Sequence, residues 1–185
     1  MPRLTKYQFR KAHEIARDFG TIFIYVSKDD ELDTHKLIAR LLKTHVVVVP
    51  KILPGKRLAA CRITSLEELR EGPFGILEPR TCTPVPKKTI DLFFIPGTAF
   101  DEHGGRKGRG AGYFDRYLAT MKGRRPIVGL CSTHMLKKRL ETRPWDVPVD
   151  ALLLEHECKV ISQPLGRPRS SRVDATRGCR AKTTR

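Results

Sequence analysis

The chain has 185 residues, 39% of them hydrophobic, and a formal charge of +16, which fits one folded domain with a basic surface. No apolar run approaches the roughly 20 residues that a membrane span needs, and the residues from Met1 to Lys6 lack a secretory signal. We therefore expect a cytoplasmic protein, with organelle targeting left open, that attracts anions such as RNA, phosphate-rich cofactors or acidic substrates.

The body of the chain alternates helix and strand patterns. Helical spacing or capping predicts helices over 5–19, 34–42, 65–70 and 112–122. Runs of β-branched, aliphatic and aromatic residues predict strands at 21–27, 46–49, 58–63, 90–95, 127–131 and 149–154. Thr34 and Ser65 are the expected helix caps, and a loop rich in Pro and Gly covers 72–88. The alternation favours an α/β fold with a mostly parallel sheet.

The five cysteines are odd in number and scattered, and none forms Cys-x-x-Cys. We therefore expect reduced thiols, with neither a disulfide framework nor a zinc knuckle. Residues 163–185 hold seven Lys or Arg against the single acid Asp174. With almost no large apolar residue, this segment is expected to be a disordered basic tail after a domain of residues 1–162.

The most informative segment runs from Gly104 to Asp115 and follows a predicted strand. Its glycines allow backbone N–H groups to approach an anion, and Arg106, Lys107 and Arg109 add positive charge. It matches neither a Walker loop nor a dinucleotide-binding turn. Phosphate binding is the favoured interpretation, and a flexible loop with solvated cations is the alternative.

Three acids are candidate ligands. Asp115 follows the glycines and Asp150 begins a strand, so both are candidates for Mg²⁺, which uses one or two carboxylates with phosphates and water. Glu31 follows the first strand, where ligands of α/β proteins collect, and could accept hydrogen bonds from a ligand. The alternatives are a helix-dipole contact for Asp115, an ordinary strand-end residue for Asp150 and a helix cap around Glu31.

Together these segments resemble the 5-formyltetrahydrofolate cyclo-ligase family, also called methenyltetrahydrofolate synthetase. The likeness covers about 21–155. It rests on the motifs Glu31-Leu-Asp-Thr34, Gly75-Ile-Leu-Glu-Pro79, Asp91 to Asp101, Gly108-Arg-Gly-Ala-Gly-Tyr-Phe-Asp115 and Val147-Pro-Val-Asp150. The resemblance implies a three-layer α/β fold of the NagB/RpiA/CoA-transferase-like kind, with helices on both faces of the sheet.

The resemblance also implies an ATP-dependent ligase of one-carbon metabolism that converts 5-formyltetrahydrofolate to 5,10-methenyltetrahydrofolate, releasing ADP and phosphate. Arg109 and Tyr113 would be catalytic, and Asp115 and Asp150 would hold Mg²⁺. ATP would be bound by Arg106, Lys107, Gly108, Arg109, Gly110, Ala111, Gly112, Tyr113 and Phe114. The reduced folate would contact Val26, Glu31, Arg109, Gly110, Ala111, Gly112 and Tyr113.

The chain departs from the family at its start. Family members begin with a basic helix that contacts ATP, and the first helix expected here resembles their second. Phe114 stands where the family has a second tyrosine, and Lys107 where it has an apolar residue. The alternative function is therefore an impaired member that binds RNA or another polyanion. A monomer without membrane contact is expected, with nucleic acid binding by the tail possible but not favoured.

Overall fold

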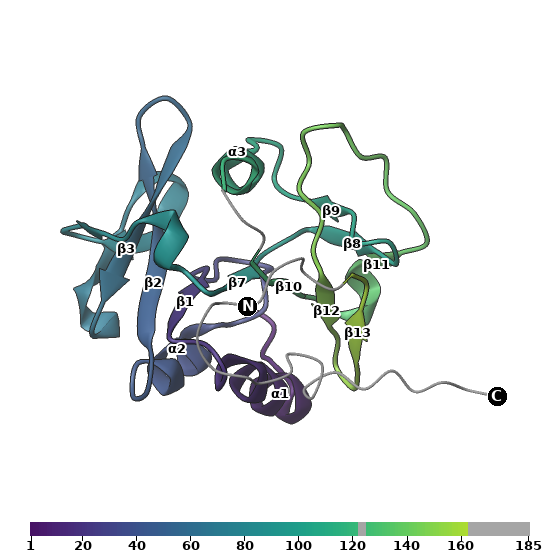
Figure 1. The fold of residues 1–185 in the computed structure, drawn as a ribbon, viewed down its shortest axis with the longest axis horizontal. Coiled ribbons are helices and arrows are strands. Elements are labelled where there is room, and N and C mark those ends of the chain that lie inside the picture. The colour runs from purple at the N-terminus through teal and green to yellow at the C-terminus, as the bar shows by residue number, and fades with distance from the viewer. Residues whose placement is uncertain (122–124, 163–185) are drawn as a thin grey trace.

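The computed structural model describes residues 1–121 and 125–162, so the tail predicted at 163–185 lies outside the described residues. An eight-stranded sheet forms the centre of the molecule (Figure 1). In spatial order its strands are β13 (Cys158–Val160), β12 (Ala151–Leu153), β10 (Ile127–Leu130), β7 (Leu92–Ile95), β1 (Thr21–Ile24), β2 (Val46–Leu53), β3 (Arg57–Ile63) and β6 (Thr83–Pro84).

The sheet is parallel at its centre and antiparallel at both edges. The neighbours from β12 through β10, β7 and β1 to β2 all pair in parallel. β13 pairs antiparallel with β12, and β3 with both β2 and β6. The prediction of a mostly parallel sheet is confirmed, and the run of valines from Val46 to Val49 lies in it as a strand covered by packing on both faces.

The helices are α1 (Lys6–Ala16), α2 (His35–Leu41) and α3 (Tyr113–Ala119). Ala12 of α1 and Leu37 of α2 pack in one cluster with Ile22 of β1. Tyr117 of α3 packs in another cluster with Phe23, the next residue of the same strand. Since successive strand residues point to opposite faces, α1 and α2 cover one face and α3 the other (Figure 1). The chain is thus a mixed α/β protein with helices on both faces of a large sheet.

Helix α1 begins where the sequence indicates, but α2 does not have the expected cap. The Thr5 hydroxyl accepts a hydrogen bond from the Gln8 N–H at 3.1 Å, and the Gln8 side chain accepts one from the Thr5 N–H at 3.0 Å. The Thr34 side chain makes no cap bond. Its hydroxyl accepts from the Ser27 N–H at 3.1 Å and donates to the Tyr25 carbonyl at 2.8 Å. The cap prediction for Thr34 was wrong because this side chain instead holds the turn after β1.

The helix predicted over 65–70 was wrong, because a short 3₁₀ turn and a strand occupy it, and the long loop predicted over 72–88 is more ordered than expected. Short 3₁₀ turns and strands occupy this region: η1 (Leu66–Glu68), β4 (Leu69–Glu71), η2 (Pro73–Gly75), β5 (Leu77–Pro79), β6 and η3 (Lys87–Thr89). Ser65 does cap its turn, by accepting from the Glu67 N–H at 3.1 Å. Strand β4 pairs antiparallel with β5 and closes the hairpin that presents residues 72–76. These strands are too short for a period of two to be read from the sequence.

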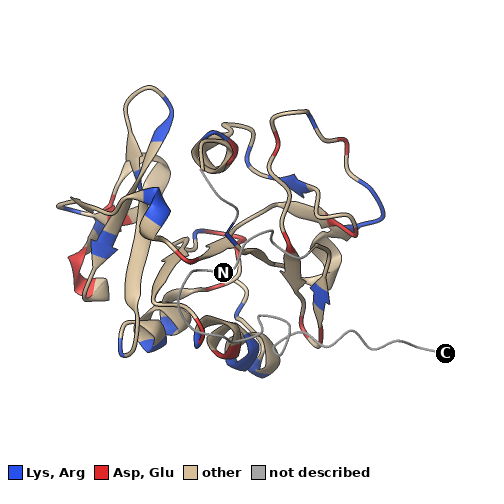
Figure 2. Ribbon diagram, in the orientation of Figure 1, with Lys and Arg blue, Asp and Glu red and all other residues tan. Residues whose placement is uncertain are grey.

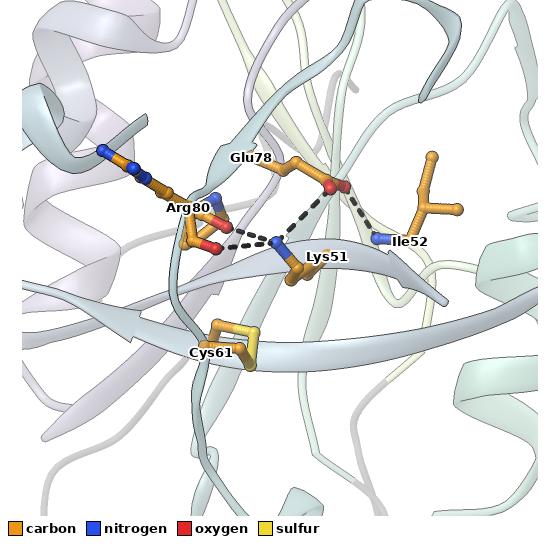
Figure 3. The surroundings of a disulfide bond; sticks show 7 residues. Lys51, Ile52, Cys61, Glu78 and Arg80 are labelled. Atoms are coloured by element: carbon orange, nitrogen blue, oxygen red, sulfur yellow. Dashed lines mark hydrogen bonds and ion pairs between the residues drawn. A yellow bond between two sulfur atoms is a disulfide. The ribbon is translucent and has the colours of Figure 1, made fainter. Parts of the chain in front are cut away.

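The expectation of reduced thiols was wrong for Cys61 and Cys82. Cys61 of β3 and Cys82 form a disulfide, with their Cα atoms 5.1 Å apart. Strand β6 pairs Pro84 with Cys61, which brings Cys82 to β3 in a way that cysteine spacing does not reveal. Next to the disulfide, the Lys51 ammonium lies 3.5 Å from the Glu78 carboxylate, which accepts from the Ile52 N–H at 2.9 Å (Figure 3). Cys131 is the free cysteine of the described residues.

Candidate active site

Three further strands build the segment beside the parallel strand ends. They are β11 (Leu136–Lys137), β8 (Ala99–Asp101) and β9 (Arg106–Lys107), which form a small sheet. Strand β7 leads through Pro96 and Gly97 into the β8–β9 hairpin, and the glycine segment then enters α3. The chain after β1 contributes Lys28 and Glu31 from the neighbouring strand end. The glycine segment therefore lies where ligands of parallel α/β sheets are found.

A narrow cavity of about 150 Å³ lies on one side of this segment. We define it by its lining: Lys28, Glu31, Phe74, Ile76, Pro96, Gly97, Thr98, Arg106, Gly108, Arg109, Ala111, Gly112, Tyr113, Phe114 and Asp115. The rings of Phe74 and Tyr113 meet edge to face, with centroids 6.5 Å apart. This cavity combines aromatic walls with two acids, Glu31 and Asp115, and suits a flat ring system that carries N–H donors.

Glu31 and Arg109 are brought together at the edge of the narrow cavity. The Arg109 Nε atom is 3.8 Å from Glu31 Oε1, and its Nη2 donates to Asp30. Glu31 also accepts from the Lys28 N–H at 3.0 Å. Burial raises the pKa of Glu31, and its hydrogen bond to Lys28 and the charge of Arg109 only partly offset this. The carboxylate is therefore held ready for hydrogen-bond donors, and Arg109 is half exposed with its charge available to an incoming anion.

The glycine segment divides into a packed part and an open part. A Cβ atom on Gly105 would lie 2.5 Å from Asp101 Oδ2, so close packing requires glycine there. Asp101 itself accepts from the N–H groups of His103, Gly105 and Leu140 at 2.9, 2.7 and 2.8 Å. Gly112 has φ of 64° and precedes α3. The open part, residues 108–112, lines the cavities, so the first glycines shape the hairpin and the later ones are free to meet a ligand.

A wide cavity of about 1280 Å³ lies on the other side of the segment. It is defined by Arg106, Lys107, Gly108, Gly110, Ala111, Gly112, Asp115, Arg116, Ala119, Arg139, Leu140, Glu141, Thr142, Arg143, Trp145 and Asp146. Figure 2 shows basic positions on β9 and along the loop that leaves β11, the two sides of this cavity. Five of the lining residues are Lys or Arg and three are Asp or Glu, so the cavity favours an anionic ligand.

Arg106 and Asp115 connect the two cavities, since both line each of them. The buried Arg106 donates from Nη2 to Asp115 Oδ1 at 2.6 Å and from Nη1 to the Pro96 carbonyl at 3.4 Å. Its Nε is buried without a hydrogen-bond partner among the described residues. Asp115 Oδ1 also lies 3.4 Å from the Val147 N–H, whereas no described residue donates to Oδ2. This arrangement leaves one guanidinium N–H and one carboxylate oxygen to be satisfied.

The structure places most of the predicted residues here, with two exceptions. Val26 is 3% exposed in the core beneath β1, and neither cavity is lined by it. Asp150 is also 3% exposed and lines neither cavity. It accepts from the Ile127 N–H at 2.9 Å and from the Ser162 hydroxyl at 2.8 Å. The two predicted metal ligands, Asp115 and Asp150, are thus not joined in one cavity, and no cluster of three or more His, Cys, Asp or Glu suited to a metal occurs in 1–121 and 125–162.

Sequence reasoning missed several lining residues. Phe74 and Ile76 come from the hairpin between β4 and β5, and the only signal was that a long ordered loop often has a function. Arg139, Arg143 and Trp145 come from the loop after β11, in the part that precedes the Val147–Asp150 motif. These residues reach the site through the fold, so their sequence position alone could not identify them.

The fold and these two cavities define an α/β protein with a cationic cavity beside a partly apolar, aromatic one and a shared glycine wall between them. The model of the 5-formyltetrahydrofolate cyclo-ligase family matches residues 5–155. The chain therefore belongs to the 5-formyltetrahydrofolate cyclo-ligase family.

Individual relatives agree with this assignment. The 5-formyltetrahydrofolate cyclo-ligase of Haemophilus influenzae is 32% identical over 144 residues, which cover 75% of this chain and 77% of that protein. The mouse protein of the same name is 28% identical over 164 residues, covering 80% and 74%. The structure of Aquifex aeolicus 5,10-methenyltetrahydrofolate synthetase superposes with a TM-score of 0.72 at 29% identity, over 89% of this chain and 85% of that one.

Proposed function

We propose that this protein is an ATP-dependent 5-formyltetrahydrofolate cyclo-ligase that forms 5,10-methenyltetrahydrofolate and releases ADP and phosphate. The observation that supports this most is the pair of cavities that share the wall of residues 108–112. The aromatic narrow cavity with Glu31 suits the pterin ring, and the cationic wide cavity suits the triphosphate. The two substrates would then meet across the glycine wall, as the reaction requires.

The reaction needs positioning and charge neutralisation more than a strong acid or base. The formyl oxygen attacks the γ-phosphorus, the bond from phosphorus to the bridging oxygen breaks, and ADP leaves. N10 of the folate then attacks the activated formyl carbon, the proton on N10 is released, and phosphate departs with the former formyl oxygen. Arg109, at the rim of the shared wall, would turn from Asp30 and Glu31 to the transferring phosphoryl group and stabilise its charge.

The remaining residues would hold the substrates. Glu31 would accept hydrogen bonds from the pterin N–H groups, and Tyr113 would pack between the substrates beside Phe74. The wide cavity would bind the phosphates through Arg106, Lys107 and the backbone of 108–112. The unpaired Nε of Arg106 would gain a phosphate oxygen as its partner. Val26 lies too deep in the core to touch the folate directly and would support the turn that carries Glu31.

Magnesium would be held by Asp115 together with the phosphates. The free Oδ2 of Asp115 fits this role, since one carboxylate oxygen with phosphates and water is a common Mg²⁺ environment. When bound, the ion would neutralise charge on the phosphate oxygens. Asp150 stays a predicted ligand whose carboxylate, as the structure has it, bonds Ile127 and Ser162. We further propose the NagB/RpiA-like fold class, a monomer and a cytoplasmic location. No described helix combines the length and apolar character needed to cross a bilayer.

Product formation tests the proposal directly. Purified protein with Mg²⁺, ATP and 5-formyltetrahydrofolate should show the near-ultraviolet absorbance of the methenyl product. Arg109→Ala should lower turnover roughly 100- to 1000-fold, the usual effect of removing a donor that stabilises developing charge. Arg57→Ala is a matched control, because Arg57 is exposed, lines neither cavity and donates to the Pro54 carbonyl of its own hairpin. Salt-sensitive RNA binding without ATP turnover would instead support the polyanion-binding alternative.

A further inference from the structure

The wide cavity carries an aromatic side chain that the proposed mechanism has not used. Trp145 is the chain's single tryptophan and is 61% exposed on the wall of this cavity. An indole offers more apolar area than any other side chain, so leaving it in water forgoes a large gain from burial. Phe74, the other aromatic side chain exposed to this extent in the described residues, lines the narrow cavity instead.

The turn that presents Trp145 is closed at both ends. The Asp146 N–H donates to the Arg143 carbonyl at 3.0 Å, and the Arg143 N–H donates to Asp146 Oδ2 at 2.8 Å. Pro144 and Trp145 are the two central residues of this turn, and proline at the first of them fixes the backbone. The N–H of Val147, the residue after this turn, donates to Asp115 Oδ1, with 3.4 Å between the nitrogen and the oxygen. Trp145 is therefore held in a defined position relative to the start of α3.

The charges around Trp145 match a nucleotide. The Arg143 guanidinium lies over the indole with its carbon 5.6 Å from the ring centroid, and the ring still keeps most of its surface open. Lys107, Arg116 and Arg139 line the same cavity, and the glycine wall forms its other side. The aromatic ring suits the base of such a ligand, and the cations and backbone N–H groups that line the rest of the cavity suit its phosphates.

We propose that Trp145 is the platform on which the base of the nucleoside triphosphate stacks, with its phosphates directed across the wide cavity to residues 107–112. This inference rests on the proposed function and adds the residue that recognises the base. Stacking engages the ring face and is indifferent to exocyclic groups, so ATP and GTP should bind with similar affinity through this contact. The pterin belongs to the narrow cavity and should not contact Trp145.

Tryptophan fluorescence tests the inference, because Trp145 is the single tryptophan of the chain and all tryptophan emission comes from it. Mg²⁺-ATP should change the emission in a saturable way, whereas inorganic tripolyphosphate should change it much less. Trp145→Ala should raise the Kd for ATP roughly 5- to 150-fold, the range observed for loss of base–aromatic stacking, and leave the Kd for tripolyphosphate within about twofold. Trp145→Phe should recover part of the affinity. Val160→Ala, which shortens an exposed apolar side chain that lines neither cavity, should leave the Kd for ATP unchanged.

The outcomes separate this inference from the proposed function. If wild-type protein forms the methenyl product while Trp145→Ala binds ATP normally, the platform is refuted and the ligase survives. Equal weakening of ATP and tripolyphosphate would show that Trp145 shapes the cavity without touching the base, which also refutes the platform. If 5-formyltetrahydrofolate changes the emission of Trp145 and ATP does not, the ring contacts the folate and the platform is refuted. Absence of both product and ATP binding in wild-type protein would overturn the two proposals together.

Discussion

Asp101 offers the sharpest test of how the glycine segment is held in place. Its buried carboxylate accepts from the N–H groups of His103, just before the glycine segment, of Gly105 within it, and of Leu140 in the loop across the wide cavity. Asp101→Ala removes all three hydrogen bonds. At about 1 to 1.5 kcal/mol for each bond, discounted because two of the three are only part-buried, the free energy of unfolding should fall by about 3 to 4 kcal/mol.

Asp101→Asn should be milder and should locate the effect. The asparagine oxygen can still accept from His103 and Gly105, but its amide group would face the Leu140 N–H, donor against donor. A loss of about 1 to 2 kcal/mol follows. Urea unfolding of both variants would measure this, with Glu102→Gln as the control. That neighbouring acid is exposed and pairs with Lys159 at the surface, so its replacement should leave the urea midpoint close to that of wild type.

The pH dependence of the Asp101 effect has a defined sign. Burial alone would raise the pKa of Asp101, but the hydrogen bonds from Leu140, His103 and Gly105 lower it overall. A carboxyl with a lowered folded-state pKa stabilises the protein fully above its unfolded pKa of about 3.9 and loses this contribution as the pH falls further. The gap between wild type and Asp101→Ala should therefore be constant near neutrality and close in acid. A gap below 0.5 kcal/mol at neutral pH would refute the reasoning.

Two further predictions concern the disulfide and Glu31, the acid proposed to bind the folate. Cys82→Ser should lower the free energy of unfolding of the oxidised protein by about 3 kcal/mol, because the bond to Cys61 closes a loop with a sequence separation of 21. In urea melts with reductant, the variant and the reduced wild-type protein should be equally stable. Burial raises the pKa of Glu31, so acid should protonate this carboxylate and raise the KM for the folate. The stability of the protein should not fall over the same pH range, because a carboxyl whose pKa is raised by folding destabilises the protein when it is deprotonated. Glu31→Gln should abolish this pH dependence of KM, and a KM profile shared by wild type and Glu31→Gln would contradict the assignment.

Part of this fold is readable from the sequence because local chemistry and tertiary packing agree there. The apolar runs at β1, β2, β7 and β10 have no other way to be buried than in a covered parallel sheet. The helix stripes also match their faces. The two predicted caps have different outcomes. Ser65 accepts a hydrogen bond within its own turn as expected, whereas the hydroxyl of Thr34 bonds the backbone of the turn that follows β1. A competing long-range partner cannot be seen from local sequence.

The candidate site was predictable where a continuous motif or the end of a strand marked it, at residues 106–115 and at Glu31. Residues 106–115 form one continuous motif, and their placement between the two cavities agrees with the interpretation as a phosphate-binding segment. Phe74 and Trp145 come from separate loops, and the Cys61–Cys82 bond depends on the pairing of β3 with β6. For Asp150 the sequence motif alone was misleading about its contacts. The motif suggests a metal ligand, whereas the carboxylate accepts hydrogen bonds from Ile127 and Ser162. Side-chain partners of this kind are set by tertiary structure.

A structure of the protein with a non-hydrolysable ATP analogue and 5-formyltetrahydrofolate would test the central claim most directly. The triphosphate should lie in the wide cavity and the pterin ring against Glu31, with the formyl oxygen facing the γ-phosphate across residues 108–112. A triphosphate bound away from these residues, or both ligands lying in the same cavity, would contradict the claim.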